Sequence, residues 1–395
     1  MKKIYSLLLL GGLLFFGVCS TSAANKLKGS WDSWIEHDFN TTSSVGEVAL
    51  VLSTGTHQFG IQDGDNFYSL TSCNITESTE DVRFYTGNSN AQITVTEAGT
   101  YTFVLKWVNG ECHLAVYFPG TTIKTYSASC IKQDGWSSAT AYAWTGEGGS
   151  DGKQLGNWPG VSLEEKTSGV YSVSFTHDVA PANIIWKGST QSTDLEFHSG
   201  ATYTTVSSTW TWYYELTVGS QGWASMYLDF AATVPANTTA YYASSVSNTS
   251  VTLTPIAAGS VIPKNTGVVV KAAAGTYKFY AADDVSAVTN KFAGTVTPES
   301  VTASTVYVLS PASTTSSCVF GLYTGTTLGA NKAYMLSSNR PSSAPAIDRI
   351  EFIIENATNI DNIEASEEAV KFFQDGKLYI KKNGVVYDMV GAIVK

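Results

Sequence analysis

Alternation of apolar and polar residues, punctuated by turn-forming dipeptides, constrains the fold of this chain more than any other feature. In residues 101–107 the four odd positions carry Tyr, Phe, Leu and Trp, and an extended backbone places such positions on one face. Asn109-Gly110 follows, and a second apolar segment occupies residues 114–118. Asn-Gly between two apolar segments is the strongest short-range signal for a β-hairpin. The pattern therefore predicts two antiparallel strands.

The same pattern recurs along the chain and predicts an all-β fold. Tyr171, Val173 and Phe175 alternate with serines, and a second hairpin is predicted around Asn383-Gly384, between residues 377–380 and 385–387. A helix is predicted only for the short segment 365–374. Strands and turns at close spacing indicate tandem β-sandwich domains of the immunoglobulin-like type.

Two turn-rich seams, at Pro119-Gly120 and at residues 218–220, divide the chain. We expect a first β-sandwich at residues 25–120, a second at 121–217, and a third, β-rich domain at 218–355. A C-terminal tail, residues 356–395, follows. With 395 residues, the chain is long enough for several domains of ordinary size.

The first 24 residues have the pattern of a cleaved signal peptide. Lys2 and Lys3 precede an apolar run at residues 7–18, which is too short to span a bilayer comfortably. Small residues up to Ala24 fit the cleavage site, and lipid attachment at Cys19 is the alternative. No later segment is apolar for long enough to form a transmembrane helix. The sequence therefore predicts a secreted protein or one on the outer cell surface.

Cleavage at Ala24 leaves four cysteines, Cys73, Cys112, Cys130 and Cys318. Export permits disulfides, and we expect Cys73 to pair with Cys112 because both fall in the first domain; buried free thiols are the alternative. The spacing contains no C-x-x-C pair and the five histidines are scattered singly, so no metal site is predicted. No cofactor is predicted either.

Low charge and many aromatic residues bear on the kind of ligand. Charged residues make up 14% of the chain and aromatic residues 12%, with 10 Trp and 21 Tyr. Such a surface suits neutral ligands with flat apolar faces, of which sugars are the commonest, although most of these rings are expected to fill β cores. The net charge of −10 argues against nucleic acid and against anionic membranes, because both need basic residues.

The second domain carries the most distinctive aromatic pattern. Tyr142 and Trp144 lie two positions apart in a strand-like segment, so their side chains share a face. Beyond a Gly-rich loop, Trp158 precedes Pro159 and Gly160, and a Pro-Gly turn fixes where its ring points. Rings set at angles on a rigid strand and turn match the curved ribbon of an α-glucan, whose glucose units expose C–H faces.

This domain resembles the starch-binding modules of carbohydrate-binding family 26. The resemblance covers about a quarter of the chain and rests on six blocks in order: residue Trp136 and residues 142–144, 158–160, 169–171, 184–187 and 191–195. It implies a β-sandwich that binds starch and malto-oligosaccharides without cleaving them.

The resemblance also implies a role for single residues of this domain. Tyr142, Trp144 and Trp158 would stack on glucose, and Lys187 and Gln191 would form hydrogen bonds with its hydroxyls. A place in the core is the alternative for each aromatic ring. The loop at residues 147–155 is longer than in the family, and such a loop would reshape or partly cover the cleft.

The first domain resembles the glycogen-binding modules of the family 48 type. The resemblance rests on three blocks: residues 29–34, 55–59 and 63–68. It implies a second carbohydrate site, in which Trp34 and either Phe67 or Tyr68 stack on the sugar. Gly60 stands where that family usually has a polar basic residue, and Trp31 is expected in the core.

The third domain and the tail carry weaker patterns. Aromatic residues thin out after Gly222, and the blocks at residues 227–230, 241–242, 262–270 and 328–334 resemble a β-rich domain near the C-termini of bacterial secreted polysaccharide-utilisation proteins. That resemblance implies a spacer or stacking role. Residues 376–380 and 391–395 resemble the C-terminal sorting domains of outer-membrane secretion, with an ordinary terminal hairpin as the alternative.

No pattern for catalysis is found. Glycoside hydrolysis needs two carboxylates at a defined separation in a cleft, and no segment resembles a catalytic barrel or carries a nucleophile-elbow, zinc-protease or phosphate-loop motif. We therefore expect a secreted or surface protein that binds starch, glycogen or malto-oligosaccharides without cleaving them, with extracellular amylases as partners. The alternative is a surface structural protein or adhesin whose β-sandwiches form a stalk without affinity for starch.

Overall fold

The computed structural model of the protein describes most of the chain between Asn25 and Tyr387. The described ranges are 25–42, 45–70, 73–87, 89–108, 110–146, 153–166, 169–311, 318–341, 347–355, 370–374, 377–382 and 385–387. The predicted signal peptide lies outside them, and so do residues 147–152 of the long loop. Within these ranges every regular element is a β-strand apart from two short 3-10 turns, η1 (Ser30–Asp32) and η3 (Ser337–Asn339). The prediction of an all-β fold is confirmed.

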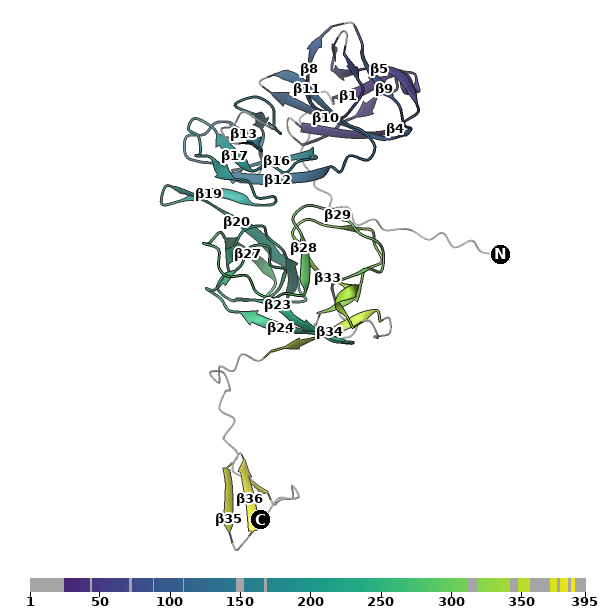
Figure 1. Ribbon diagram of the computed structural model, residues 1–395. Helices are drawn as coiled ribbons and strands as arrows, with labels where there is room; N and C mark the ends of the chain where they lie inside the picture. The colour runs from purple at the N-terminus through teal and green to yellow at the C-terminus, as the bar shows by residue number, and fades with distance from the viewer. Residues whose placement is uncertain are drawn as a thin grey trace, which may run out of the picture.

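The first unit is a sandwich of two mainly antiparallel sheets (Figure 1). Phe59 of one sheet and Phe103 of the other are fully buried and meet edge to face, with ring centroids 5.7 Å apart. The predicted hairpin at 101–118 is present, with Val108 opposite Glu111. The strands are β1 (Lys26–Gly29), β2 (His37–Asp38), β3 (Asn40–Thr42), β4 (Val45–Leu52), β5 (Gly55–Asp63), β6 (Asn66–Ser69), β7 (Asn74–Ile75), β8 (Thr79–Thr86), β9 (Ala91–Val95), β10 (Gly99–Val108) and β11 (Glu111–Tyr117).

The second unit is also built from two sheets. Strands β18, β17, β13 and β14 form one of them, and β15, β16, β12, β19 and β20 form the other. Trp186 and Tyr203 are fully buried between the sheets, with ring centroids 5.8 Å apart. The strands are β12 (Lys124–Ile131), β13 (Ala139–Trp144), β14 (Val161–Leu163), β15 (Glu165–Lys166), β16 (Val170–His177), β17 (Asn183–Lys187), β18 (Leu195–Glu196), β19 (Thr202–Val206) and β20 (Thr209–Val218).

The third unit centres on one nine-stranded sheet in the order β21-β26-β23-β24-β34-β31-β30-β33-β28. The sheet curls, because its first strand β21 also packs against β33 near the opposite end of the order. Its inner face encloses a core that includes Phe292, Phe320 and Met335. The strands are β21 (Trp223–Met226), β22 (Ala232–Thr233), β23 (Thr238–Val246), β24 (Ser250–Ile256), β25 (Val261–Ile262), β26 (Val268–Ala272), β27 (Gly275–Tyr280), β28 (Phe292–Thr295), β29 (Glu299–Ser300), β30 (Val306–Pro311), β31 (Cys318–Leu322), β32 (Thr327–Leu328), β33 (Lys332–Leu336) and β34 (Arg349–Ile354).

The tail contains a three-stranded antiparallel sheet, β35 (Val370–Gln374), β36 (Lys377–Lys382) and β37 (Val385–Tyr387). Strands β36 and β37 form the hairpin predicted from the Asn-Gly dipeptide. The helix predicted for residues 365–374 is wrong over 370–374, where β35 pairs with β36 along its whole length. Pairing with a neighbouring strand overrides the weak helical preference of so short a segment. Residues 365–369 lie outside the described ranges.

Sheets and core continue across both seams of the chain. Val108 of β10 pairs with Val161 of β14, so a sheet of the first unit runs on into the second. Strand β20 of the second unit pairs with β27 of the third over six residue pairs. One cluster of buried apolar side chains includes Val104 of the first unit, Trp186 of the second and Phe279 of the third. The division into domains at residues 120 and 217 stays a prediction.

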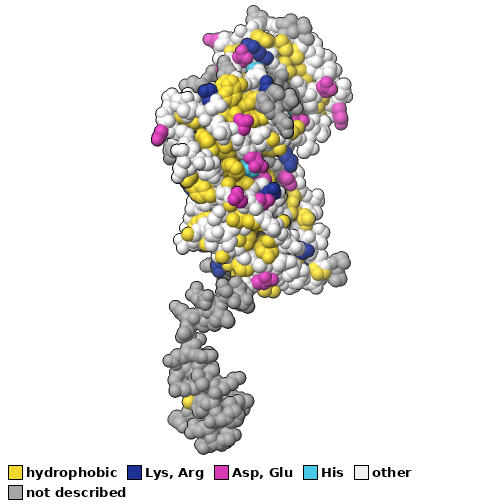
Figure 2. Space-filling model, turned by 60° about the vertical axis from the view of Figure 1, so that its left-hand side comes forward, with side chains coloured by type: hydrophobic (Ala, Val, Ile, Leu, Met, Phe, Trp, Pro, Cys, Tyr) yellow, Lys and Arg dark blue, Asp and Glu magenta, His cyan; other side chains and the backbone are white. Residues whose placement is uncertain are grey.

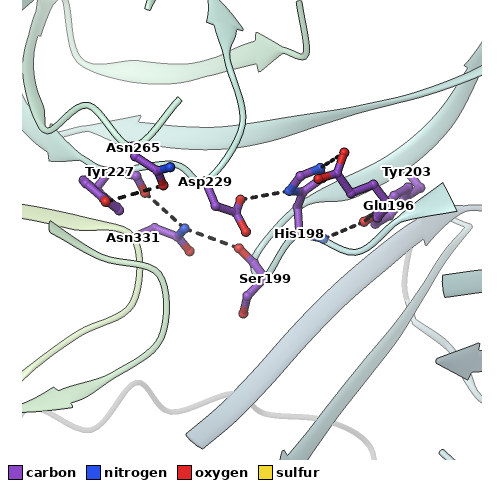
Figure 3. A network of polar contacts seen from close by, with 8 residues as sticks. All are labelled: Glu196, His198, Ser199, Tyr203, Tyr227, Asp229, Asn265 and Asn331. Atoms are coloured by element: carbon purple, nitrogen blue, oxygen red, sulfur yellow. Dashed lines mark hydrogen bonds and ion pairs between the residues drawn. The ribbon is translucent and has the colours of Figure 1, made fainter. Parts of the chain in front are cut away.

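A polar network also joins the second and third units (Figure 3). His198 is buried, and its Nδ1 lies 3.0 Å from a carboxylate oxygen of Asp229. The Asn331 amide donates hydrogen bonds to the backbone oxygens of Ser199, at 3.3 Å, and Tyr227, at 3.2 Å. The network fixes the end of the second unit against the third because His198 and Ser199 belong to the one and their partners to the other.

The predicted disulfide between Cys73 and Cys112 is absent, since both side chains are free thiols. Cys112 is buried on β11, and Cys73 packs, partly exposed, against the same apolar cluster. The alternative of buried free thiols therefore holds for Cys112, Cys130 and Cys318, while Cys73 is half-buried. Burial raises the pKa of the Cys112 and Cys130 thiols. The first unit is held together by its core without a covalent cross-link.

The described ranges contain neither a membrane-spanning helix nor a group of side chains placed to bind a metal ion. No helix there is long and apolar enough to cross a membrane. No group of three His, Cys, Asp or Glu side chains within the same ranges is placed to hold a metal ion.

Candidate functional site

Strand β13 separates the core of the second unit from an aromatic cluster on its outer face. Ala141 and Ala143 are fully buried in the core, and Tyr142 and Trp144 project from the opposite side. On this outer side they form a cluster with Ile185, which lies directly opposite Tyr142 on β17. The strand places its small side chains inward and its aromatic rings outward.

Trp158 completes the cluster at its solvent side. The Tyr142 and Trp144 rings stack with centroids 5.3 Å apart and an interplanar angle of 28°. The Trp158 ring meets Tyr142 edge to face, at 5.5 Å and 77°. Trp158 is 44% exposed, whereas Tyr142 and Trp144 are 4% and 3% exposed. The exposed indole therefore stands on a base of two covered rings.

The turn after Trp158 requires glycine. Gly160 has a φ of +86°, in the left-handed region that side chains other than glycine rarely adopt. A Cβ at this position would lie 1.9 Å from the Ala141 carbonyl oxygen, so the turn approaches β13 only because glycine is present. Its N–H donates a hydrogen bond to the Asn157 carbonyl oxygen at 2.8 Å. This close approach holds the Trp158 ring against Tyr142.

Lys187 and Gln191 lie near one end of the cluster. Lys187 is opposite Thr140 on β13, two positions along the strand from Tyr142, and therefore on the same outer face. Gln191 is exposed and bridges back to Lys187 through a β-bridge. Lys187 Nζ lies 3.5 Å from the Gly188 carbonyl oxygen, a contact at the outer limit for a hydrogen bond. The two polar side chains predicted from the resemblance thus lie together beside the rings.

Two polar residues at the other end were missed by sequence reasoning. Lys153 forms a β-bridge with Trp144, and its Nζ donates to the Asn157 side-chain oxygen at 3.0 Å. Asn157 directly precedes Trp158, and that position beside the turn was the available signal. Donors and acceptors therefore flank the exposed Trp158 ring at both ends of β13.

The cluster has the chemistry of a site for a neutral sugar. An exposed indole offers an apolar face to the C–H face of a pyranose, and burial of apolar area is worth about 25 cal/mol per Å². The Lys187 ammonium, the Gln191 amide and the Asn157 amide can exchange hydrogen bonds with hydroxyls. Burial raises the pKa of the Tyr142 hydroxyl, so the Tyr142 ring beneath Trp158 stays uncharged at ordinary pH.

The structure separates the two aromatic residues predicted as alternatives in the first unit. Tyr68 meets Trp107 edge to face at 5.1 Å, on the core side of β6. Phe67 lies on the opposite face, where a Cβ on Gly60 would come within 2.1 Å of the end of its ring. Phe67 is half-buried, and so is Trp34, which follows η1 with a φ of +69°. Phe67, and not Tyr68, faces outward.

Gly60 and Trp31 each have a structural explanation. Gly60 leaves room for the Phe67 ring over the sheet. Trp31 packs against Phe59 and Phe103, with centroids 6.1 and 5.8 Å away, as expected for a core residue. Gln62 lies directly opposite Phe67 in the sheet.

Comparison with known protein families gives a match within the second unit. Residues 129–197 match the family described as starch-binding module 26. That range contains all five residues predicted for the main site and the strands β13, β14, β17 and β18 of the sheet that carries it. No curated protein and no solved structure matches the chain. The likeness to starch-binding modules therefore covers the second unit alone, and the resemblances of the first unit and the tail stay predictions.

Proposed function

We propose that the protein is a secreted or cell-surface, non-catalytic protein that captures α-glucan chains by aromatic stacking. The observation that carries this proposal is the exposed Trp158 ring, buttressed by Tyr142 and Trp144 inside the range similar to starch-binding modules. Few charged side chains interrupt the visible surface (Figure 2), which suits a neutral polymer. Starch, glycogen and malto-oligosaccharides are the ligands we infer, and extracellular amylases are the partner enzymes.

In this proposal the three aromatic residues of the site have unequal roles. Trp158 supplies the stacking face, because 44% of its surface is exposed to solvent. Tyr142 and Trp144 hold that ring in place, and they contact the sugar only along their exposed edges. The side chains of Lys187, Gln191 and Asn157 select the sugar through its hydroxyls.

Retention on insoluble starch tests the proposal. The full-length protein should be retained on starch granules and retarded in an amylopectin gel, and it should bind maltoheptaose in preference to cello-oligosaccharides. A straight β-linked chain presents its rings to a flat surface, whereas one exposed ring with polar groups at both ends suits a curved chain. Migration as free as that of a non-binding protein would contradict the proposal.

A structural role is the second candidate function. The pairing of β10 with β14 at Val108 and Val161, the ladder between β20 and β27, and the shared core make the three units suitable as a stiff stalk. A surface stalk or adhesin of this kind would need no affinity for starch. The retention experiment separates the two candidates, since only the first predicts binding.

The first unit provides a second, weaker candidate site for glycan. Phe67 lies on the outer face of the sheet beside Gln62, and Lys28 lies opposite Gly60 on β1. Lys28 Nζ also lies 3.4 Å from a Glu36 carboxylate oxygen, so it is partly engaged. With Trp34 near the same edge of the unit, we propose that Phe67 is the principal aromatic contact of this site.

A further inference from the structure

The third unit contains a cavity at one end of its core. The cavity has a volume of about 680 Å³ and lies where β21, β26 and β34 end. Small-molecule sites occupy about 300–1,000 Å³ and occur in the mouths of curled sheets. They combine apolar walls with a few convergent polar groups. This cavity has the size and the position of a ligand site.

Two aromatic rings line the floor of the cavity. Trp223 and Phe352 meet edge to face with centroids 5.3 Å apart, and Trp223 also contacts the buried Tyr241 at 5.6 Å. Trp223 is opposite Lys271 on β26, two positions from the fully buried Val269. It therefore belongs to the inner face of the sheet, at the point where that face reaches solvent.

Two polar side chains line the rim. The Lys271 ammonium lies 5.6 Å from the centroid of the Trp223 ring, within the range of a cation–π contact. Gln221 is exposed at the opening. Glu351 also lies at the opening, but its side chain projects from the face of β34 opposite Phe352, where it receives a hydrogen bond from Arg349 at 3.2 Å. The rim thus offers one ammonium and one amide.

We propose that this mouth, formed by Gln221, Trp223, Lys271, Glu351 and Phe352, binds a short neutral oligosaccharide. The two rings supply apolar contact for a pyranose face, and the mixed rim can both donate to and accept from hydroxyls. A purely apolar ligand would bury the Lys271 ammonium and the Gln221 amide without hydrogen-bond partners. The choice of an α-glucan as the sugar rests on the proposed function of the second unit.

Titration of the full-length protein with maltoheptaose tests this site. A double variant, Trp158→Ala with Phe67→Ala, removes the stacking rings of the other two candidate sites. It should still bind maltoheptaose weakly, with one molecule per chain. Adding Lys271→Ala and Gln221→Ala should lower that residual affinity by about tenfold or more, a change well within calorimetric resolution. Both added positions are exposed, so the core remains intact, and circular dichroism checks the fold.

A matched control uses Lys264→Ala, which removes another exposed lysine of the same unit, one that pairs with Asp284 outside the mouth. Residual affinity should be unchanged in this control. If the wild type binds but the double variant shows no binding at millimolar maltoheptaose, the third site is refuted and the proposed function stands. Residual binding that ignores Lys271→Ala and Gln221→Ala also refutes it. Absence of binding by the wild type would refute both.

Discussion

At the scale of single residues, His177 links the stability of the molecule to pH. It is 1% exposed and lies at the end of β16, against the Tyr117 ring of the first unit at 6.1 Å. Burial, reinforced by the charge of Lys106, lowers the pKa of His177 to about 4, although the Asp178 carboxylate opposes the shift. The Val179 N–H also donates to its Nδ1 at 3.0 Å.

The lowered pKa predicts a loss of stability on mild acidification. Between pH 6.5 and about 4 the unfolded chain binds a proton at His177 and the folded chain does not. Stability from this residue is therefore complete above pH 6.5 and lost as the pH falls, by on the order of 3 kcal/mol. Denaturant unfolding across this window should show the loss, and His177→Gln should flatten the slope. An equal slope in both proteins would contradict the account.

At the scale of elements, strand β6 illustrates how far alternation can be used. The neighbours Phe67 and Tyr68 had to lie on opposite faces, because successive side chains of a strand alternate. Sequence alone could not tell which face was outward. Tyr68 packs on Trp107, and Phe67 takes the space that Gly60 leaves free over the sheet. The glycine at position 60 and the outward Phe67 ring are thus one local arrangement.

A pair of substitutions tests this arrangement. Phe67→Ala should weaken binding of glycogen or maltoheptaose by about threefold to fivefold if the first unit contacts glycan, because a half-buried ring contributes up to about 1 kcal/mol of stacking. Tyr68→Phe, which keeps the ring against Trp107, should leave affinity unchanged. Affinity electrophoresis provides the measurement. A loss of affinity with Tyr68→Phe and none with Phe67→Ala would contradict the assignment of Phe67 to the face that contacts glycan.

The strongest sequence signals were those whose cause is local. The Asn-Gly hairpins, the outward Trp158 beside its Pro-Gly turn, and the inward Trp31 could all be predicted from neighbouring residues. The burial of Tyr142 and Trp144 could not be predicted in this way. Alternation shows which face of a strand a side chain occupies, but it does not show what packs over that face. Strand β35 was missed because its partner β36 supplies the stabilising contacts.

At the scale of the whole molecule, the three units form one continuous assembly in Figure 1. The pairing of Val108 with Val161 and the long β20–β27 ladder connect residues far apart in sequence or across a turn. Pairing between distant strands cannot be predicted from composition. The sequence therefore predicts domain boundaries at positions where the structure has sheets shared between units. A fixed spacing between Trp158, Phe67 and the mouth around Trp223 would let one glucan chain contact several sites, which raises avidity through effective concentration.

Calorimetric titration of Trp158→Ala with maltoheptaose tests the central claim most directly. Trp158 is the exposed ring of the main site, and truncation of such a ring should cost about 1–2 kcal/mol of affinity, or five- to thirtyfold in Kd. Tyr280→Ala removes another exposed aromatic ring, 38% exposed and outside the three candidate sites, and should bind like the wild type. Circular dichroism confirms folding of both variants. Equal affinity of Trp158→Ala and the wild type would contradict the account.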